Sequence, residues 1–191
     1  METLTWITFA VIIIVLLAWY LTYSAARLDR LHAKVEGSAA ALEAQLVRRA
    51  DSALELGASG LLDPASSLLL VDAASQSLDE SAERARGDLL DIRGLTGLEG
   101  VESGLTEALN AALEPEAVAS LRARGGEAAV AALGRIEAAG LRVQLARRFH
   151  NQAVTDVQRV RRKRVVRAFR LAGRAHLPET IEFDDALTID R

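Results

Sequence analysis

An uncharged apolar run near the start of the sequence limits the possible folds more than any other feature. Residues 4–23 read LTWITFAVIIIVLLAWYLTY and contain no Asp, Glu, Lys or Arg. An α-helix rises about 1.5 Å per residue, so about 20 residues cross the roughly 30 Å hydrocarbon core of a bilayer. Trp6 lies near one end of the run, and Trp19, Tyr20 and Tyr23 lie near the other, where aromatic rings favour the membrane interfaces. The run predicts a single transmembrane helix.

The basic residues around this helix predict its orientation. Residues 1–3 contain no Lys or Arg, whereas Arg27, Arg30 and Lys34 follow the apolar run. The positive-inside rule then places residues 1–3 outside and the long C-terminal part in the cytoplasm, with the helix in the cell membrane. A cleaved signal peptide ending at residues 24–26 (Ser-Ala-Ala) is the alternative. It is disfavoured because no basic segment precedes the run, which is also long and flanked by aromatics.

Composition predicts that the rest of the chain is helical. Aromatic residues make up only 4% of the sequence, there are three prolines, and no β-branched alternation occurs outside the apolar run, which favours long helices over a sheet. The sequence has no cysteine, so disulfides and a lipoprotein anchor are excluded. We therefore expect an all-α protein in which the transmembrane helix continues into one helical domain.

Turn signals divide this domain into helices. The first helix is expected to end around residues 57–60, and Asp63-Pro64 is a typical start for the next one. The expected later helices cover residues 64–90, 99–123 (with a possible interruption at 114–115) and 127–171, the last beginning after Gly125-Gly126. Four amphipathic helices with short connections predict an antiparallel four-helix bundle with coiled-coil-like packing over residues 24–172. Residues 173–191 are expected to form an irregular, mobile, acidic tail.

A basic run near the end of the last helix is the first candidate site. Its members are Arg159, Arg161, Arg162, Lys163, Arg164, Arg167 and Arg170. In an antiparallel bundle this end returns to the membrane, where anionic headgroups attract each basic residue by about 1 kcal/mol. A solvated helix end is the simpler alternative. Nucleic-acid binding is disfavoured because the run lacks interleaved aromatics apart from Phe169.

Two polar clusters form the second candidate site. Their members are Gln45, Arg48, Arg49 and Asp51 on the first helix, and Arg142, Arg147, Arg148 and Asn151 on the last. Counting residues from the membrane puts the two clusters at similar heights, about 36 and 30 Å out. We therefore expect one polar layer that fixes the helix register, in which Asp51 and Gln45 pair with Arg148 and Asn151. The alternative is a set of independent exposed charges.

These clusters resemble the LemA family of bacterial membrane proteins. The family's first cytoplasmic helix has a pattern like Q-L-x-R-R-x-D-L-I-P, which residues 45–51 (QLVRRAD) match before diverging at Ser52. Its last helix reads like R-I-A-x-A-R-R-x-Y-N-x-A-V, similar to residues 142–154 with His150 at the Tyr position. The family's F-x-x-x-x-x-F-E ending is echoed only by Phe169 and residues 183–185 (Phe-Asp-Asp). The resemblance implies an anchored helical bundle and no particular reaction.

No catalytic or metal-binding pattern emerges from the remaining residues. Asp29-x-x-His32 resembles half of a di-iron motif without its second half. Of the other histidines, His150 and His176, the first has Arg147 and not an acid three residues before it. We therefore expect a protein that is not an enzyme and binds no cofactor.

The predicted function is that of a scaffold or adaptor. It would sit at the cytoplasmic face of the membrane, contact anionic lipid and an unidentified protein partner, and possess surfaces suited to homo-oligomers. The alternatives are a stress-sensing module that regulates a partner membrane protein and an envelope- or lipid-modifying enzyme with an unrecognised site. Contact of the chain with nucleic acid is not expected.

Overall fold

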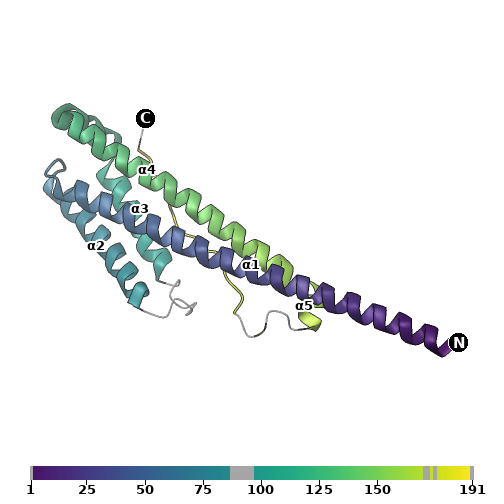
Figure 1. The fold of residues 1–191 in the computed structure, drawn as a ribbon. Helices are drawn as coiled ribbons and strands as arrows, with labels where there is room; N and C mark the ends of the chain where they lie inside the picture. The colour runs from purple at the N-terminus through teal and green to yellow at the C-terminus, as the bar shows by residue number, and fades with distance from the viewer. Residues whose placement is uncertain (1, 87–96, 170–172, 174–175, 190–191) are drawn as a thin grey trace. The chain divides into compact units, whose positions relative to one another are not determined.

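The computed structural model describes residues 2–86, 97–169, 173 and 176–189, which form helices and no β-strand (Figure 1). The helices are α1 (Glu2–Ala58), α2 (Pro64–Arg86), α3 (Leu98–Ala112), α4 (Pro115–Arg161) and α5 (Arg164–Ala168). The predicted all-α class is confirmed over these residues. The expected ends of the second helix at Leu90 and of the last at Leu171 lie outside the described residues.

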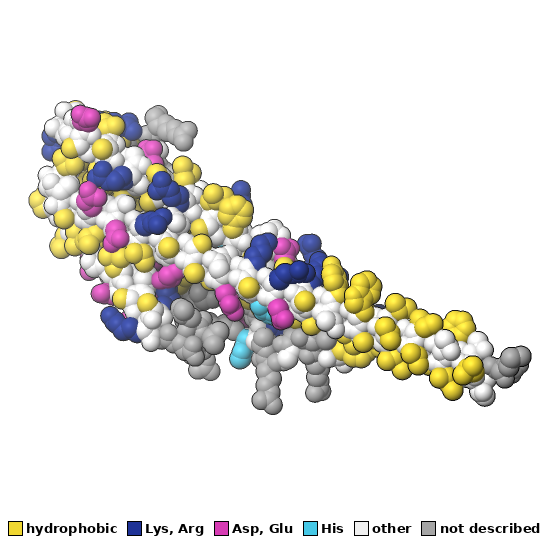
Figure 2. Space-filling model, in the orientation of Figure 1, with side chains coloured by type: hydrophobic (Ala, Val, Ile, Leu, Met, Phe, Trp, Pro, Cys, Tyr) yellow, Lys and Arg dark blue, Asp and Glu magenta, His cyan; other side chains and the backbone are white. Residues whose placement is uncertain are grey.

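Helix α1 is continuous from the apolar run to Ala58, which confirms the predicted end near residues 57–60. By length and composition, α1 is the one helix among the described residues that is suited to crossing a membrane. Its apolar side chains are exposed along the run apart from the half-buried Leu21, and Figure 2 shows a hydrophobic surface near the N-terminus. Trp6 and Trp19 are 75% and 72% exposed, so this surface has no partner within the described chain.

The chain forms two compact units. Unit 1 contains Met1–Gly37 and Gln152–Glu179, and unit 2 contains Ser38–Asn151 and Thr180–Arg191. Helices α1 and α4 therefore each contribute to both units. The polar clusters of the sequence fall in unit 2, whereas the apolar run and the basic run fall in unit 1.

Unit 1 has a small apolar core just beyond the apolar run. Leu28 of α1 is buried against Val157 and Val160 of α4 and Val166 of α5. Lys34 also forms an ion pair with Asp156, with 3.4 Å between Nζ and Oδ2. These contacts hold the C-terminal end of α4 beside the part of α1 that follows the apolar run.

The last helix is shorter than expected, because α4 ends at Arg161 and α5 begins at Arg164. Lys163 between them has an extended backbone, with φ −65° and ψ 135°. Two physical effects favour this break. Consecutive cations in adjacent turns repel one another, and in a continuous helix Val160 and Val166 would point about 120° apart. The break allows both valines to reach the Leu28 core.

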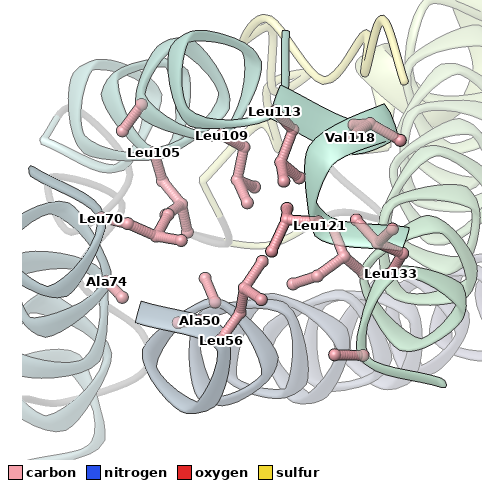
Figure 3. Close-up of a cluster of buried hydrophobic side chains, with 14 of the residues drawn as sticks. Ala50, Leu56, Leu70, Ala74, Leu105, Leu109, Leu113, Val118, Leu121 and Leu133 are labelled. Carbon is pink, nitrogen blue, oxygen red and sulfur yellow. The ribbon is translucent and has the colours of Figure 1, made fainter. Parts of the chain in front are cut away.

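Unit 2 has the main core, to which α1, α2, α3 and α4 all contribute (Figure 3). Leu56 of α1, Leu70 of α2, Leu109 of α3 and Leu133 of α4 are each at most 2% exposed. Small residues such as Ala53, Ala74 and Ala129 lie between the leucines. Ala in these positions lets the helix backbones approach closely while the leucines fill the interior.

The expected third helix, over residues 99–123, is divided at the possible interruption that the sequence indicated at residues 114–115. Helix α3 ends at Ala112 and α4 begins at Pro115, the first helical position, where proline is well tolerated. The expected break at Gly125-Gly126 is a local kink inside α4, where Gly126 has φ 53° and ψ −135°. The proline is therefore the true boundary, and the glycine pair bends a helix that continues.

The register of α1 and α4 within unit 2 differs from the expected one. Ser38 of α1 lies against His150 of α4, with 3.2 Å between Oγ and Nδ1. Further along α1, Leu42 and Leu46 belong to the same apolar cluster as Val143 of α4. Residue numbers therefore rise along α1 in the direction in which they fall along α4. Arg48 is therefore about ten residues, or about 15 Å, from the level of His150. The prediction assumed a helix reaching Arg170, whereas α4 ends nine residues earlier, at Arg161.

Candidate functional site

Residues 176–189 of the expected tail have no helix or strand structure, and part of this segment is packed against unit 2 instead of lying free in solvent. Residues 180–189, which we call the strap, lie extended on unit 2 without helix or strand structure. Ile181, Phe183 and Asp185 are buried, Leu187 and Ile189 are partly buried, and the residues between them are exposed. This alternation is that of an extended segment with one face against a surface. The surface beneath it, formed by side chains of α1, α3 and α4, is called the strap groove.

Side-chain amides of the groove bind the backbone of the strap. The Asn151 amide accepts a hydrogen bond from the N–H of Ile181 (2.9 Å) and donates one to its carbonyl (3.0 Å). Asn110 acts in the same way, donating to the carbonyl of Ala186 and accepting from the N–H of Thr188, both at 2.9 Å. These amides satisfy backbone groups that a neighbouring β-strand would otherwise satisfy.

An aromatic side chain of the strap fills the centre of the groove. The Phe183 ring is 8% exposed and belongs to a cluster with Leu42 and Leu46 of α1, Leu98 of α3, Val143 of α4 and the strap residue Ile181. Two guanidinium groups lie near the ring, with the Cζ atoms of Arg49 and Arg147 at 5.8 and 5.4 Å from its centroid. Both distances lie within the range of cation–π contacts.

A bidentate ion pair fixes the strap two residues further on. Arg147 donates from Nε to Oδ2 of Asp185 (2.7 Å) and from Nη2 to Oδ1 (3.1 Å), and from Nη1 to Glu182 (2.9 Å). The hydrogen bonds to Asp185 raise the pKa of Arg147 above its ordinary value, against the opposing effect of burial. Charge-assisted bidentate pairs are the strongest and most directional of protein hydrogen bonds.

A buried polar network lies under the strap. Arg49 of α1 donates to the carboxylate of Glu102 of α3 at 2.6 Å and to Thr106 at 3.0 Å. Ser77 of α2 donates to the other carboxylate oxygen at 2.7 Å. Thr106 donates to the carbonyl of Asp184 at 2.7 Å. The network thus joins α1, α2 and α3 to the strap.

The predicted polar layer is only partly assembled. Arg49, Arg147 and Asn151 meet at the strap. Arg48, Asp51 and Arg142 line a shallow surface depression between α1 and α4 together with Ser52 and Arg135. The expected pairing is wrong: Asn151 binds Ile181 and Glu182, and Oε1 of Gln45 is buried without a hydrogen-bond partner. Asp51 and Arg148 form no ion pair with any described residue. The shifted register explains the difference, because Arg48 and Asp51 lie opposite residues 131–142.

The basic run lies in unit 1, around the break between α4 and α5. Arg159, Arg162, Lys163, Arg164 and Arg167 are exposed, whereas Arg161 is partly buried and donates to the carbonyl of His176 at 2.6 Å. Arg170 lies outside the described residues. Val166, which lies among these cations in sequence, is buried in the Leu28 core.

Sequence reasoning missed Glu102 and Thr106, which complete the buried network, and did not assign a role to Asp185. For Glu102 the available signal was a carboxylate among apolar helix neighbours, between Val101 and Leu105. For the strap it was the alternation of Ile181, Phe183, Leu187 and Ile189 with polar residues or Ala186. No group of three or more His, Cys, Asp or Glu side chains among the described residues is arranged to hold a metal ion.

No protein-family model, curated protein or solved structure matches this chain. The resemblance to the LemA family therefore stays a prediction. Three of the matching segments nevertheless meet in unit 2, where the guanidinium groups of Arg49 and Arg147 both lie near the ring of Phe183. Chemically, the site can bind an extended peptide that supplies an aromatic ring and, two residues later, a carboxylate.

Proposed function

We propose that this chain is a membrane-anchored helical scaffold or adaptor of the LemA type. The observation that carries the proposal is the apolar run of α1, whose large side chains are exposed over about 20 residues. Exposed apolar surface of this size is unstable in water and is satisfied by lipid. The run is followed by a helical domain with a main core formed by four helices.

The domain is best described as an antiparallel four-helix bundle. Its support is the main core shared by α1, α2, α3 and α4, and the opposite running directions of α1 and α4 in unit 2. The short connections from Ala58 to Pro64 and from Ala112 to Pro115 also favour antiparallel neighbours.

The same reasoning gives the proposed topology. Arg27, Arg30 and Lys34 follow the apolar run within one helix, which favours a cytoplasmic location for the domain in the cell membrane. A reporter fused after Arg191 tests this. A fluorescent protein that matures in the cytoplasm should be bright, and an alkaline phosphatase that needs export should be inactive. The reverse result would contradict the topology.

Contact with anionic lipid is part of the proposal, and the core of unit 1 supports it. The basic run adjoins the Leu28 core, and Leu28 lies only five residues after Tyr23 at the end of the apolar run. Exposed cations at that level lie within reach of headgroups, and each adds about 1 kcal/mol of attraction. Arg162, Lys163 and Arg164 lie in or beside the non-helical break, where a protease can reach the backbone.

Limited trypsin digestion of the full chain in nanodiscs tests this contact. Cleavage at residues 162–164 should be slower in anionic than in zwitterionic nanodiscs, and high salt should remove the difference because it screens the attraction. Cleavage at Arg86, which is exposed at the C-terminal end of α2 in unit 2, provides the internal control. Equal cleavage rates in both lipids would contradict lipid contact.

An exposed apolar stripe on α4 supports an adaptor role. Leu141, Leu145 and Phe149 recur every four residues and are 56%, 51% and 61% exposed. This spacing places them on one helix face, the pattern by which helices bind partner proteins. In-cell proximity labelling should lose specific neighbours when Leu145 and Phe149 are both changed to Glu. The matched change of the exposed Leu68 and Leu69 on α2 should leave those neighbours unchanged, and equal loss from both variants would contradict a specific surface.

A further inference from the structure

We propose that the strap groove is an intermolecular binding site whose ligand is the strap of a second copy of this chain. Anchored copies would then be linked by exchanged straps, each groove holding residues 180–189 of a neighbour. The proposal goes beyond the scaffold role and does not depend on lipid contact, because every residue of the groove and of the strap belongs to unit 2.

The groove is built to recognise an extended chain. Asn151 and Asn110 each bind both the N–H and the C=O side of the strap backbone. Gln144 adds a hydrogen bond to the carbonyl of Asp185 at 2.7 Å. Ser103 accepts one from the N–H of Asp184 at 3.0 Å. These contacts join side chains to an extended backbone, the mode by which peptide-binding proteins hold their ligands.

Two side-chain contacts give the groove its specificity. The Phe183 ring occupies an apolar site near two guanidinium groups, and Asp185 forms the bidentate pair with Arg147. A ligand must therefore supply an aromatic ring and a carboxylate two residues apart. The strap of a second copy satisfies every one of these contacts, because its sequence is identical.

The path of the chain permits exchange. The chain leaves unit 2 at Asn151 and enters it again at Thr180, and residues 176–179 just before this entry have no helix or strand structure. Hydrogen bonds from Gln158 to the Pro178 carbonyl and from Arg161 to the His176 carbonyl would open when the strap moves to another copy. Exchange of an identical element is a low-cost route to dimers. A chain's own strap competes for the groove at an effective concentration of about millimolar order. Confinement to a membrane raises the concentration of neighbouring straps in the same way.

Disulfide trapping tests the proposal, since the chain has no native cysteine. Two full-length chains with different epitope tags are co-expressed, one carrying Ser103→Cys and the other Asp184→Cys. After mild oxidation of the membranes, we expect a covalent dimer with both tags. Its yield should exceed by roughly tenfold or more that of a collision control pairing Ala65→Cys, on the first turn of α2, with Asp184→Cys.

A matched pair of variants separates groove binding from general association. Arg147→Ala in the Ser103→Cys chain should lower the yield of the dimer, because it removes the ion pair with Asp185. Arg148→Ala, at the adjacent exposed position, should leave the yield unchanged. Equal effects of the two variants would overturn the proposal.

One further chain checks the geometry. A single chain with both Ser103→Cys and Asp184→Cys should close an intrachain disulfide, and Asn110→Cys with Thr188→Cys repeats the test at a second contact. The proposal is overturned if a single-chain pair closes while the mixed chains give no more dimer than the collision control. It is equally overturned if neither single-chain pair closes, or if the cysteine introduced by Ser103→Cys is joined only to a different protein.

Discussion

The Nη2 atom of Arg49 lies 2.6 Å from Oε2 of Glu102, and both side chains are completely buried. Arg49 belongs to a motif that is visible in the sequence, whereas Glu102 comes from another helix. Removing two charges from water costs several kcal/mol each, and the pair offsets this cost only when its other polar atoms are satisfied. Ser77 and Thr106 supply part of that satisfaction, while Nε of Arg49 has no partner within the described chain.

Breaking this pair from one side should be more harmful than removing it entirely. Glu102→Leu leaves a buried guanidinium without a counter-charge and should lower the free energy of unfolding by about 3–5 kcal/mol. The double variant Arg49→Met with Glu102→Leu should be more stable than Glu102→Leu alone, because no buried charge remains. Urea denaturation of the full chain in detergent micelles, followed by circular dichroism, measures both. A double variant as unstable as the single one would contradict the argument.

Two glycines of α4 should respond oppositely to the same substitution. A Cβ at Gly134 would meet no atom within 4 Å. Gly134→Ala should therefore raise the free energy of unfolding by about 0.5–1 kcal/mol through helix propensity. A Cβ at Gly140 would lie 2.5 Å from Cδ1 of Leu187 in the strap, so Gly140→Ala should displace that side chain. Amide hydrogen exchange at residues 186–189 should then become faster in Gly140→Ala and stay unchanged in Gly134→Ala.

The helical class could be predicted from sequence because its signals are local. The end of α1 at Ala58, the start of α2 at Pro64 and the all-α class follow from periodicity and turn residues. The register of α1 against α4 could not be predicted, because it depends on where α4 ends. That end follows from charge repulsion and from the packing of Val160 and Val166, which together outweigh helix propensity.

The site was harder to predict than the fold. The motif residues Arg49, Arg147 and Asn151 were identified, but their partners were not, since Glu102, Phe183 and Asp185 are distant in sequence. The acidic composition of the tail favoured the prediction of a solvated segment. The alternating apolar residues, which indicate a segment with one buried face, were given less weight. The strap packs on the groove because the groove supplies cations and amides for it, a complementarity that composition alone does not reveal.

The kink in α4 should be sensitive to any side chain at Gly126. Its φ of 53° with ψ of −135° is a conformation that residues with a Cβ rarely adopt. Gly126→Ala should lower the free energy of unfolding by about 1–3 kcal/mol through backbone strain. Gly104→Ala in α3, where a Cβ would meet no atom within 4 Å, should stabilise the chain instead. Thermal unfolding of both variants in micelles measures these changes. A Gly126→Ala variant with an unchanged free energy of unfolding would contradict the strained geometry.

The buried His150 should make the stability of the domain depend on pH. Its ring is 3% exposed, and Nε2 has no hydrogen-bond partner within the described chain. Burial lowers the pKa of His150 below its ordinary value of 6.5 because the imidazolium would lose its hydration. The unfolded chain therefore takes up this proton more readily than the folded one. Stability should fall as the pH drops through about 6.5, and the loss from this group should be complete below the folded pKa.

A substitution that cannot be protonated tests this directly. His150→Phe should reduce the fall in melting temperature between about pH 7.5 and 5.5, although it also removes the contact with Ser38. The comparison therefore uses the change of melting temperature with pH and not the absolute melting temperature. Carboxylates that titrate in both proteins contribute equally to both changes, so their contributions cancel in the difference. His176→Phe, at an exposed position, should keep the slope of the unmodified protein. If His150→Phe keeps that slope as well, the pH dependence must come from other groups.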